Sequence, residues 1–172
     1  LVVVTGEVGS GKTLLTQALR SELGDHHVII DIANPRIGQS ELLAAVLSKL
    51  GLENPGESAL WDALKERLIA LTEENRRVVL LIDEAHQLPE STFASLCLFS
   101  NIETPTQKLL QIVLVGQDEL SILLEQHSLR QINQRVSHRA CLHRLNSKDT
   151  QRYIHHRLHV AGGVPRLFPP KI

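Results

Sequence analysis

The chain has 172 residues, of which 42% are hydrophobic, and its formal net charge is −1 at pH 7. This length allows one sizeable hydrophobic core, and a total of two cysteines, Cys97 and Cys141, excludes a disulfide framework. Because no apolar run approaches the ~20 residues of a membrane span and no signal peptide is visible, we expect a cytoplasmic protein with both thiols buried.

Short apolar runs rich in β-branched residues alternate along the chain with longer helical patterns. Strands are predicted over residues 2–5, 28–32, 78–83, 111–115 and 139–143. Helices are predicted over residues 12–23, 40–50, 58–72, 90–100, 119–125 and 147–161, the last one capped by Ser147. This alternation predicts an α/β fold whose parallel sheet is covered on both faces. Since the chain starts within the first strand and lacks methionine, we expect it to be part of a longer protein.

Residues 6–13 read GEVGSGKT and fit the phosphate-loop pattern G-x-x-x-x-G-K-[ST] at every fixed position. The pattern lies between a predicted strand and a predicted helix, where backbone N–H groups and the helix N-terminus can surround phosphate oxygens. Lys12 would reach the β- and γ-phosphates, and Thr13 would bind Mg²⁺. The alternative is a glycine-rich turn that binds nothing. The residues expected around the nucleotide are Gly6, Glu7, Val8, Gly9, Ser10, Gly11, Lys12, Thr13 and Leu14.

A second acidic element is needed for hydrolysis, and residues 78–84, VVLLIDE, supply one. Five apolar residues predict a strand buried on both faces, with two carboxylates at its carboxyl end, where ligands bind in open α/β sheets. Asp83 would hold Mg²⁺, and Glu84 would accept a proton from the attacking water. The alternative is a solvated strand end.

The acidic pair also indicates which nucleotide is bound. Consecutive Asp83-Glu84, without a guanine-reading Asn-Lys-x-Asp segment, favours ATP over GTP. Residues 83–86 read DEAH, as in one class of helicases, but 172 residues cannot hold two motor domains. We therefore expect His86 to be a sensing or packing residue.

Two further polar residues follow predicted strands. Gln117 comes after the strand over 111–115 and could contact the γ-phosphate, or be an ordinary loop glutamine. Asn34 ends the second predicted strand and could hydrogen-bond Glu84, holding it unproductive until a partner binds.

Positive charge gathers in the last part of the chain. Residues 1–126 hold nine Lys/Arg and eighteen Asp/Glu, whereas residues 127–172 hold nine Lys/Arg and one acidic residue, Asp149. Arg130, Arg135 and Arg139 lie too far along the fold to reach their own phosphates, so a neighbouring subunit's nucleotide is their expected target, Arg135 first and Arg130 second. They could instead be surface charge, or part of a basic segment for nucleic acid or anionic lipid.

Several segments resemble one family of AAA+ ATPases. Besides the phosphate loop and VVLLIDEAHQL over 78–88, they are LCLFSNIET over 96–104, KLLQIVLVGQDEL over 108–120 and LRQINQRV over 129–136. They are similar to the ExeA (GspA) family of type II secretion and, within it, to the branch that serves biogenesis of the mannose-sensitive haemagglutinin (MSHA) pilus. Asn34-Pro35 also matches, whereas His86 stands where the family usually has glutamine.

The resemblance implies a P-loop NTPase of AAA+ type over residues 1–145, with three α/β/α layers around a five-stranded parallel sheet of order 5-1-4-3-2. Residues 146–172 would begin a helical lid domain. The resemblance also implies self-association into a ring or dimer, envelope assembly or secretion proteins as partners, and a location at the cytoplasmic face of the bacterial inner membrane. The G-x-P-R run over 163–166 comes too early in such a lid, so Arg166 is excluded from the site.

Two other functions remain open at this point. One is a DNA-binding ATPase of the transposition-helper or origin-recognition type, against which stand the near-neutral charge, the 3% aromatic content and the lack of a helix-turn-helix pattern. The other is a scaffold that binds ATP without turnover, which Asp83 and Glu84 make the less favoured.

Overall fold

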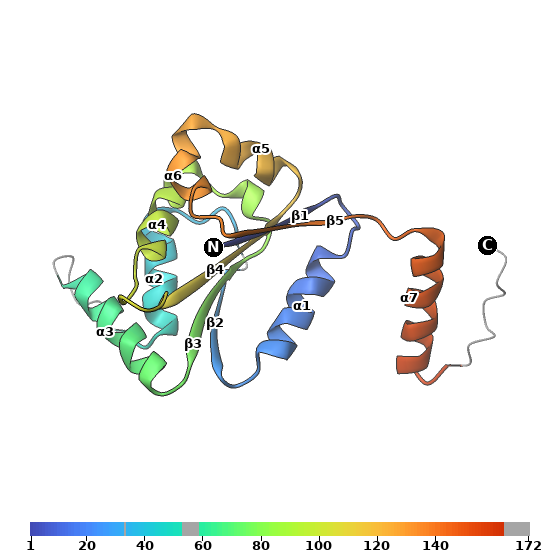
Figure 1. Ribbon diagram of the computed structural model, residues 1–172, viewed down its shortest axis with the longest axis horizontal. Coiled ribbons are helices and arrows are strands. Elements are labelled where there is room, and N and C mark those ends of the chain that lie inside the picture. The colour runs from blue at the N-terminus through green and yellow to red at the C-terminus, as the bar shows by residue number, and fades with distance from the viewer. Residues whose placement is uncertain (33, 53–58, 164–172) are drawn as a thin grey trace. The chain divides into compact units, whose positions relative to one another are not determined.

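The computed structural model describes residues 1–32, 34–52 and 59–163 (Figure 1). The chain divides into two compact units, Leu1–Leu142 and His143–Ile172. The predicted division into residues 1–145 and 146–172 stays a prediction. That residues 146–172 begin a helical lid stays a prediction, because residues 164–172 lie outside the described part, as does the excluded Arg166.

The first unit is built on a five-stranded parallel sheet with the order β2-β3-β4-β1-β5. Read from the other edge, this is the predicted order 5-1-4-3-2, so the predicted fold is confirmed. The strands are β1 (Val2–Gly6), β2 (His27–Ile32), β3 (Arg77–Ile82), β4 (Leu110–Gly116) and β5 (His138–Leu142). In β3, every residue after Arg77 is buried, as expected for a strand covered on both faces.

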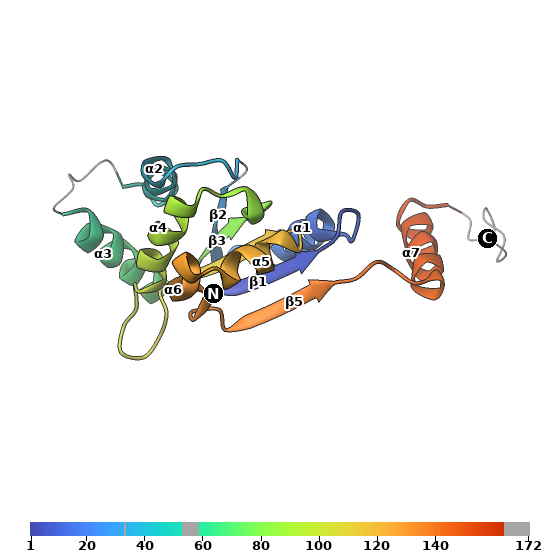
Figure 2. The same cartoon turned by 90° about the horizontal axis from the view of Figure 1, so that it is seen from above.

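Helices cover the two faces of the sheet unequally. The larger hydrophobic core joins one face to residues of α2 (Gln39–Lys49), α3 (Leu60–Glu73), α4 (Glu90–Ser100), α5 (Glu119–Glu125) and α6 (Arg130–Asn133). The smaller core, with Val4, Leu81 and Val115 at its centre, contacts α1 (Lys12–Leu23) through Leu19. Figure 1 shows α1 on the other side of the sheet from α2, α3 and α4, and α2 and α4 pack together (Figure 2).

Three short elements were missed in the sequence: α6 and two single 3₁₀ turns, η1 (Ala85–Gln87) and η2 (His127–Leu129). One predicted burial is wrong. Cys97 is buried in α4, but Cys141 is exposed, because β5 is an edge strand in which every residue before Leu142 is exposed.

In the second unit, α7 (Ser147–Val160) follows Asn146. The predicted serine cap is wrong by one position: Asn146 Oδ1 accepts the N–H of Asp149 at 2.9 Å, which satisfies one of the free donors of the first helical turn. No residue of α7 is buried. Among the described residues, no helix is long and apolar enough to cross a membrane.

Candidate nucleotide-binding site

The parallel register brings the predicted site residues to one edge of the sheet. Thr5 in β1 pairs with Gly116 at the end of β4, and Ile82 at the end of β3 is in register with Leu114 in β4 and Ile32 in β2. The segments that follow these strands therefore emerge side by side at the carboxyl edge. They carry the glycine-rich loop, Gln117, the acidic pair Asp83-Glu84, and Asn34.

The loop between β1 and α1 depends on its glycines. Gly9 and Gly11 have φ of 82° and 96°, a left-handed backbone that costs other residues about 1–2 kcal/mol. Gly6 is restricted by space instead: a Cβ there would lie 2.6 Å from both the Leu142 carbonyl oxygen and Ser10 Oγ. These positions explain why the loop needs glycine at 6, 9 and 11.

Lys12 places its charge inside this loop. The residue is only 7% exposed, and Nζ donates hydrogen bonds to the carbonyl oxygens of Gly6 at 2.8 Å and Glu7 at 2.9 Å. A buried ammonium is costly unless it is paired, and two neutral carbonyls pair it only in part. The loop therefore presents a buried cation suited to an anion.

In the described part of the chain, the loop also has polar groups without partners that could bind a phosphate. Ser10 Oγ is buried and has no hydrogen-bond partner in the described structure, so a donor hydroxyl is available there. Thr13, in the first turn of α1, is exposed. Its hydroxyl and the Asp83 carboxylate are the oxygen ligands that Mg²⁺ prefers. The residues present fit a nucleotide phosphate chain with Mg²⁺.

The acidic pair lies in a tight turn after β3. Asp83 Oδ1 accepts the N–H of Glu84 at 2.8 Å. Glu84 itself has φ 52°, a left-handed conformation that is strained for a residue with a Cβ. Its Oε2 is buried without a hydrogen bond in the described structure. The turn thus holds a carboxylate oxygen that is buried and has no hydrogen-bond donor on it among the described residues.

His86, in η1, connects this turn to the end of β4. The backbone N–H of Gln117 donates to His86 Nδ1 at 3.3 Å, and the same nitrogen lies 3.4 Å from Glu84 Oε2. The sequence left His86 as a sensing or packing residue. Its contacts depend on β3 and β4 being neighbours, which no local pattern around His86 reveals.

Asn34 is not joined to Glu84 by any hydrogen bond in the described structure. Its side chain is exposed, and Oδ1 accepts the N–H of Arg36 at 3.1 Å within its own turn. Whether Asn34 acts on Glu84 stays a prediction.

The three predicted arginines are exposed, and Arg135 lies away from the loop. Arg135 follows α6 and lines a hollow with Leu1 and Leu110, the residues at the amino ends of β1 and β4, so it lies at the opposite edge from Lys12. Burial raises the pKa of the Cys97 thiol above its ordinary value, although the positive charge of Arg135 acts the other way. Arg139 donates to the Asn133 side chain.

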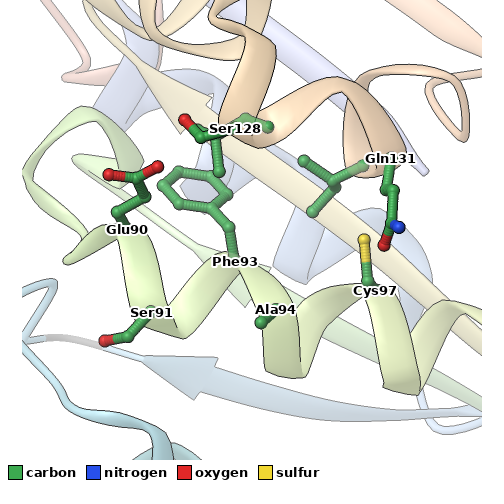
Figure 3. Close-up of a pocket in the computed structure, with 9 residues that line it drawn as sticks. Glu90, Ser91, Phe93, Ala94, Cys97, Ser128 and Gln131 are labelled. Atoms are coloured by element: carbon green, nitrogen blue, oxygen red, sulfur yellow. The ribbon is translucent and has the colours of Figure 1, made fainter.

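A cavity of about 380 Å³ lies elsewhere, between α4 and the segment of η2 and α6. Figure 3 shows Phe93 and Cys97 from α4 facing Ser128 and Gln131 across it. None of the residues predicted to bind nucleotide lines this cavity. The polar residues of the candidate site are therefore concentrated in the loop and turns of the carboxyl edge.

Comparison with known proteins gives one related sequence and several related folds. General secretion pathway protein A of Aeromonas hydrophila is 39% identical over 173 residues, which cover 99% of this chain and 32% of that protein. The chain thus spans about a third of this relative's length.

Among solved structures, the ORC2 protein of Aeropyrum pernix in its ADP form has a TM-score of 0.66 at 18% identity, covering 99% of this chain and 49% of that one. The RuvB Holliday junction branch migration motor of Thermotoga maritima has a TM-score of 0.56 at 22% identity, covering 94% and 43%. Identities this low show a shared fold alone. The model of the AAA domain matches residues 1–124, more than half of the sequence, and the chain therefore belongs to the AAA domain family.

Proposed function

We propose that this chain is an ATPase that binds ATP with Mg²⁺ and hydrolyses it to drive assembly of a bacterial pilus or type II secretion apparatus. The observation that carries the proposal is the buried Lys12 ammonium in its glycine-rich loop, on the same sheet edge as a strained acidic turn. A buried cation binds phosphate, and a carboxylate at the same edge of the sheet supplies the base that hydrolysis needs and binding does not.

The loop residues bind and orient the phosphates. Lys12 exchanges the carbonyls of Gly6 and Glu7 for the β- and γ-phosphate oxygens, which pair its charge fully. Backbone N–H groups from Gly6 to Leu14 and the Ser10 hydroxyl add donors around the phosphates. This set fixes the reacting phosphate without any covalent step on the protein.

Glu84 takes the proton of the attacking water. Among the described residues, its Oε2 is buried without a hydrogen bond, and the strained turn fixes the position of the carboxylate. Thr13 and Asp83 would hold Mg²⁺, which neutralises developing charge on the phosphate oxygens. Gln117, between loop and turn at the end of β4, is suited to contact the γ-phosphate.

The arginines support a site completed by a second subunit. Arg135 lies at the amino edge, away from Lys12 of its own chain, and Arg130 and Arg139 are exposed nearby in sequence. An arginine that cannot reach its own nucleotide can reach one bound next to it, in a ring or a dimer. We propose Arg135 as the first candidate and Arg130 as the second.

The relative supports the proposed cellular role. General secretion pathway protein A, 39% identical to this chain, favours a secretion-related role. The resemblance noted in the sequence extends this to the MSHA pilus protein MshM, to envelope assembly partners, and to the cytoplasmic face of the inner membrane.

A second candidate is a DNA-binding ATPase. The observation in its favour is α7, which exposes Lys148, Arg152 and Arg157 and has no buried residue. Phosphate contacts from such cations would give binding that falls steeply with salt.

Three assays on the purified chain test the proposal: equilibrium binding of a fluorescent ATP analogue with Mg²⁺, phosphate release from ATP with GTP as the control, and a duplex DNA shift at physiological salt. We expect saturable ATP binding and ATP hydrolysis that GTP does not match. Absence of ATP binding would overturn the proposal, and a salt-sensitive DNA shift would promote the second candidate.

A further inference from the structure

The ring nitrogen Nδ1 of His86 faces two groups of the candidate site. It accepts the backbone N–H of Gln117 at 3.3 Å, and it lies 3.4 Å from Glu84 Oε2. The imidazole is largely enclosed, with 14% of the side chain exposed, whereas the Glu84 side chain is 39% exposed. One atom therefore stands between the proposed base and the residue proposed to contact the γ-phosphate.

The two contacts exclude each other. In a neutral imidazole, Nδ1 either carries a lone pair and accepts, or carries a hydrogen and donates. When it accepts from Gln117, it has no hydrogen for Glu84. This agrees with Glu84 Oε2, which is buried and lacks a hydrogen bond in the described structure. When it donates to Glu84, the N–H of Gln117 must find another partner.

The fold restricts the movement of His86, so Nδ1 stays close to both groups. Ala85 is fully buried beside it, and a Cβ on Gly116 would lie 3.3 Å from the His86 backbone nitrogen, so η1 is packed closely on the end of β4. The charged residues of the neighbouring turns are Asp83, Asp118 and Glu119, all acidic. His86 Nδ1 lies within ion-pair distance of Glu84 Oε2.

We infer that His86 is a positioning residue that couples Gln117 to Glu84. In the nucleotide-free chain, Nδ1 holds the Gln117 backbone. When Gln117 shifts toward a γ-phosphate, the ring changes tautomer: Nδ1 takes a proton from water while Nε2 gives one up to water, so the ring stays neutral. The Nδ1–H then donates a hydrogen bond to Glu84 Oε2 without transferring its proton, and so fixes the carboxylate with its other oxygen free to receive the proton of the attacking water. This inference rests on the proposed function and deepens it, because it names how the site would register a bound triphosphate.

The first test is spectroscopic and needs no turnover. Nitrogen NMR of the histidine rings, with the His86 signals assigned by their loss in His86→Gln, reports which ring nitrogen carries the hydrogen. We expect an unprotonated Nδ1 in the free chain and a protonated Nδ1 with a non-hydrolysable ATP analogue and Mg²⁺. A protonated Nδ1 in the free chain, or no change on saturation with the analogue, would overturn the inference.

The second test is kinetic. His86→Phe fills the space but cannot hydrogen-bond, and we expect single-turnover hydrolysis to slow about 10- to 100-fold with ATP binding unchanged. His86→Gln can accept with Oε1 and donate with Nε2, so it should stay within about threefold of wild type. His127→Phe, in the other 3₁₀ turn, is the matched control and should have no effect. Thermal unfolding checks that each variant is folded.

The outcomes separate the two proposals. Unchanged hydrolysis in His86→Phe, with slow hydrolysis in Glu84→Gln, would reject the coupling and leave the ATPase intact. Absence of ATP binding by the wild type would reject the ATPase, and with it the coupling.

Discussion

The two edges of the sheet differ in which residues adopt left-handed backbone. At the turns that lead into β2 and β3, positive φ falls on Gly24 and Asn75, residue types that adopt it readily. At the carboxyl edge it falls on Gly9 and Gly11, but also on Glu84, for which it costs about 1–2 kcal/mol. Strain that no local preference explains is thus found where the candidate site lies.

The edges also differ in how they satisfy polar side chains. At the amino edge, Arg77 Nη1 donates to Gln107 Oε1 at 2.9 Å, and Lys108 pairs with Glu103. At the carboxyl edge lie Ser10 Oγ and Glu84 Oε2, the two buried side-chain oxygens that have no hydrogen-bond partner in the described structure. Within the described part of the chain, the amino edge also has a buried side-chain atom without a partner, Arg76 Nε, but that atom is a nitrogen donor. The carboxyl edge is thus where the described residues leave buried side-chain oxygens without a partner.

The largest effect should come from the buried cation. Lys12→Ala removes the charge that the phosphates would pair, and we expect ATP binding to become undetectable. The control is Lys49→Ala, an exposed lysine in α2, which should bind ATP as the wild type does. Tight ATP binding by Lys12→Ala in a titration with a fluorescent analogue would remove the phosphate-loop assignment.

Arg135, at the amino edge, is predicted to act only on the nucleotide of a neighbouring subunit. Arg135→Ala should lose about 10³–10⁵ in hydrolysis rate while still binding ATP. Mixing it with Lys12→Ala subunits should restore part of the activity, since one subunit supplies the arginine and the other the loop. If the mixture stays inactive under conditions where the chains associate, Arg135 does not act across subunits.

Glu84→Gln tests whether the residue in the strained turn is the general base. The amide keeps the shape of the side chain but cannot take a proton, so phosphate release should slow about 10²–10⁴-fold with ATP binding retained. Glu119→Gln, at the start of α5, is a matched control on the same edge. Equal turnover in Glu84→Gln and wild type would mean that another group is the base.

The smallest effect concerns the strain itself. Glu84→Gly relieves the left-handed backbone but makes the unfolded chain more flexible, so the free energy of unfolding should rise by about 0.5–1 kcal/mol, even as hydrolysis is lost. Asn75→Gly should change it by less, because asparagine tolerates this conformation. Urea unfolding of both variants measures the difference. A destabilised Glu84→Gly would show that the turn is held for stability.

The sequence predicted the elements whose patterns are long or strongly apolar. The five strands and α1, α2, α4, α5 and α7 lie within one or two residues of their predicted ends, and α3 begins two residues later than predicted. The acidic pair could be placed because the run before it is wholly apolar, so Asp83 and Glu84 must lie at the carboxyl end of that strand. The loop could be placed because its spacing is fixed by phosphate geometry.

The rest depends on contacts between distant residues. The helix α6, Arg130–Asn133, is too short to show a helical period. Exposure of Cys141 follows from the edge position of β5, which the resemblance implied but the local pattern around Cys141 does not show. The hydrogen bond from Gln117 to His86 joins the ends of β3 and β4, which are neighbours in the sheet but are separated in the sequence by α4.

The two hydrogen bonds from Lys12 to the Gly6 and Glu7 carbonyls affect how fast the loop can release one nucleotide and bind the next. They give the ammonium hydrogen-bond partners within the loop, so the buried charge is not left without partners when a product dissociates. The same bonds must break when the next nucleotide enters, so affinity is a difference between two sets of contacts. The loop competes with its own ligand, and that competition favours turnover over indefinite retention.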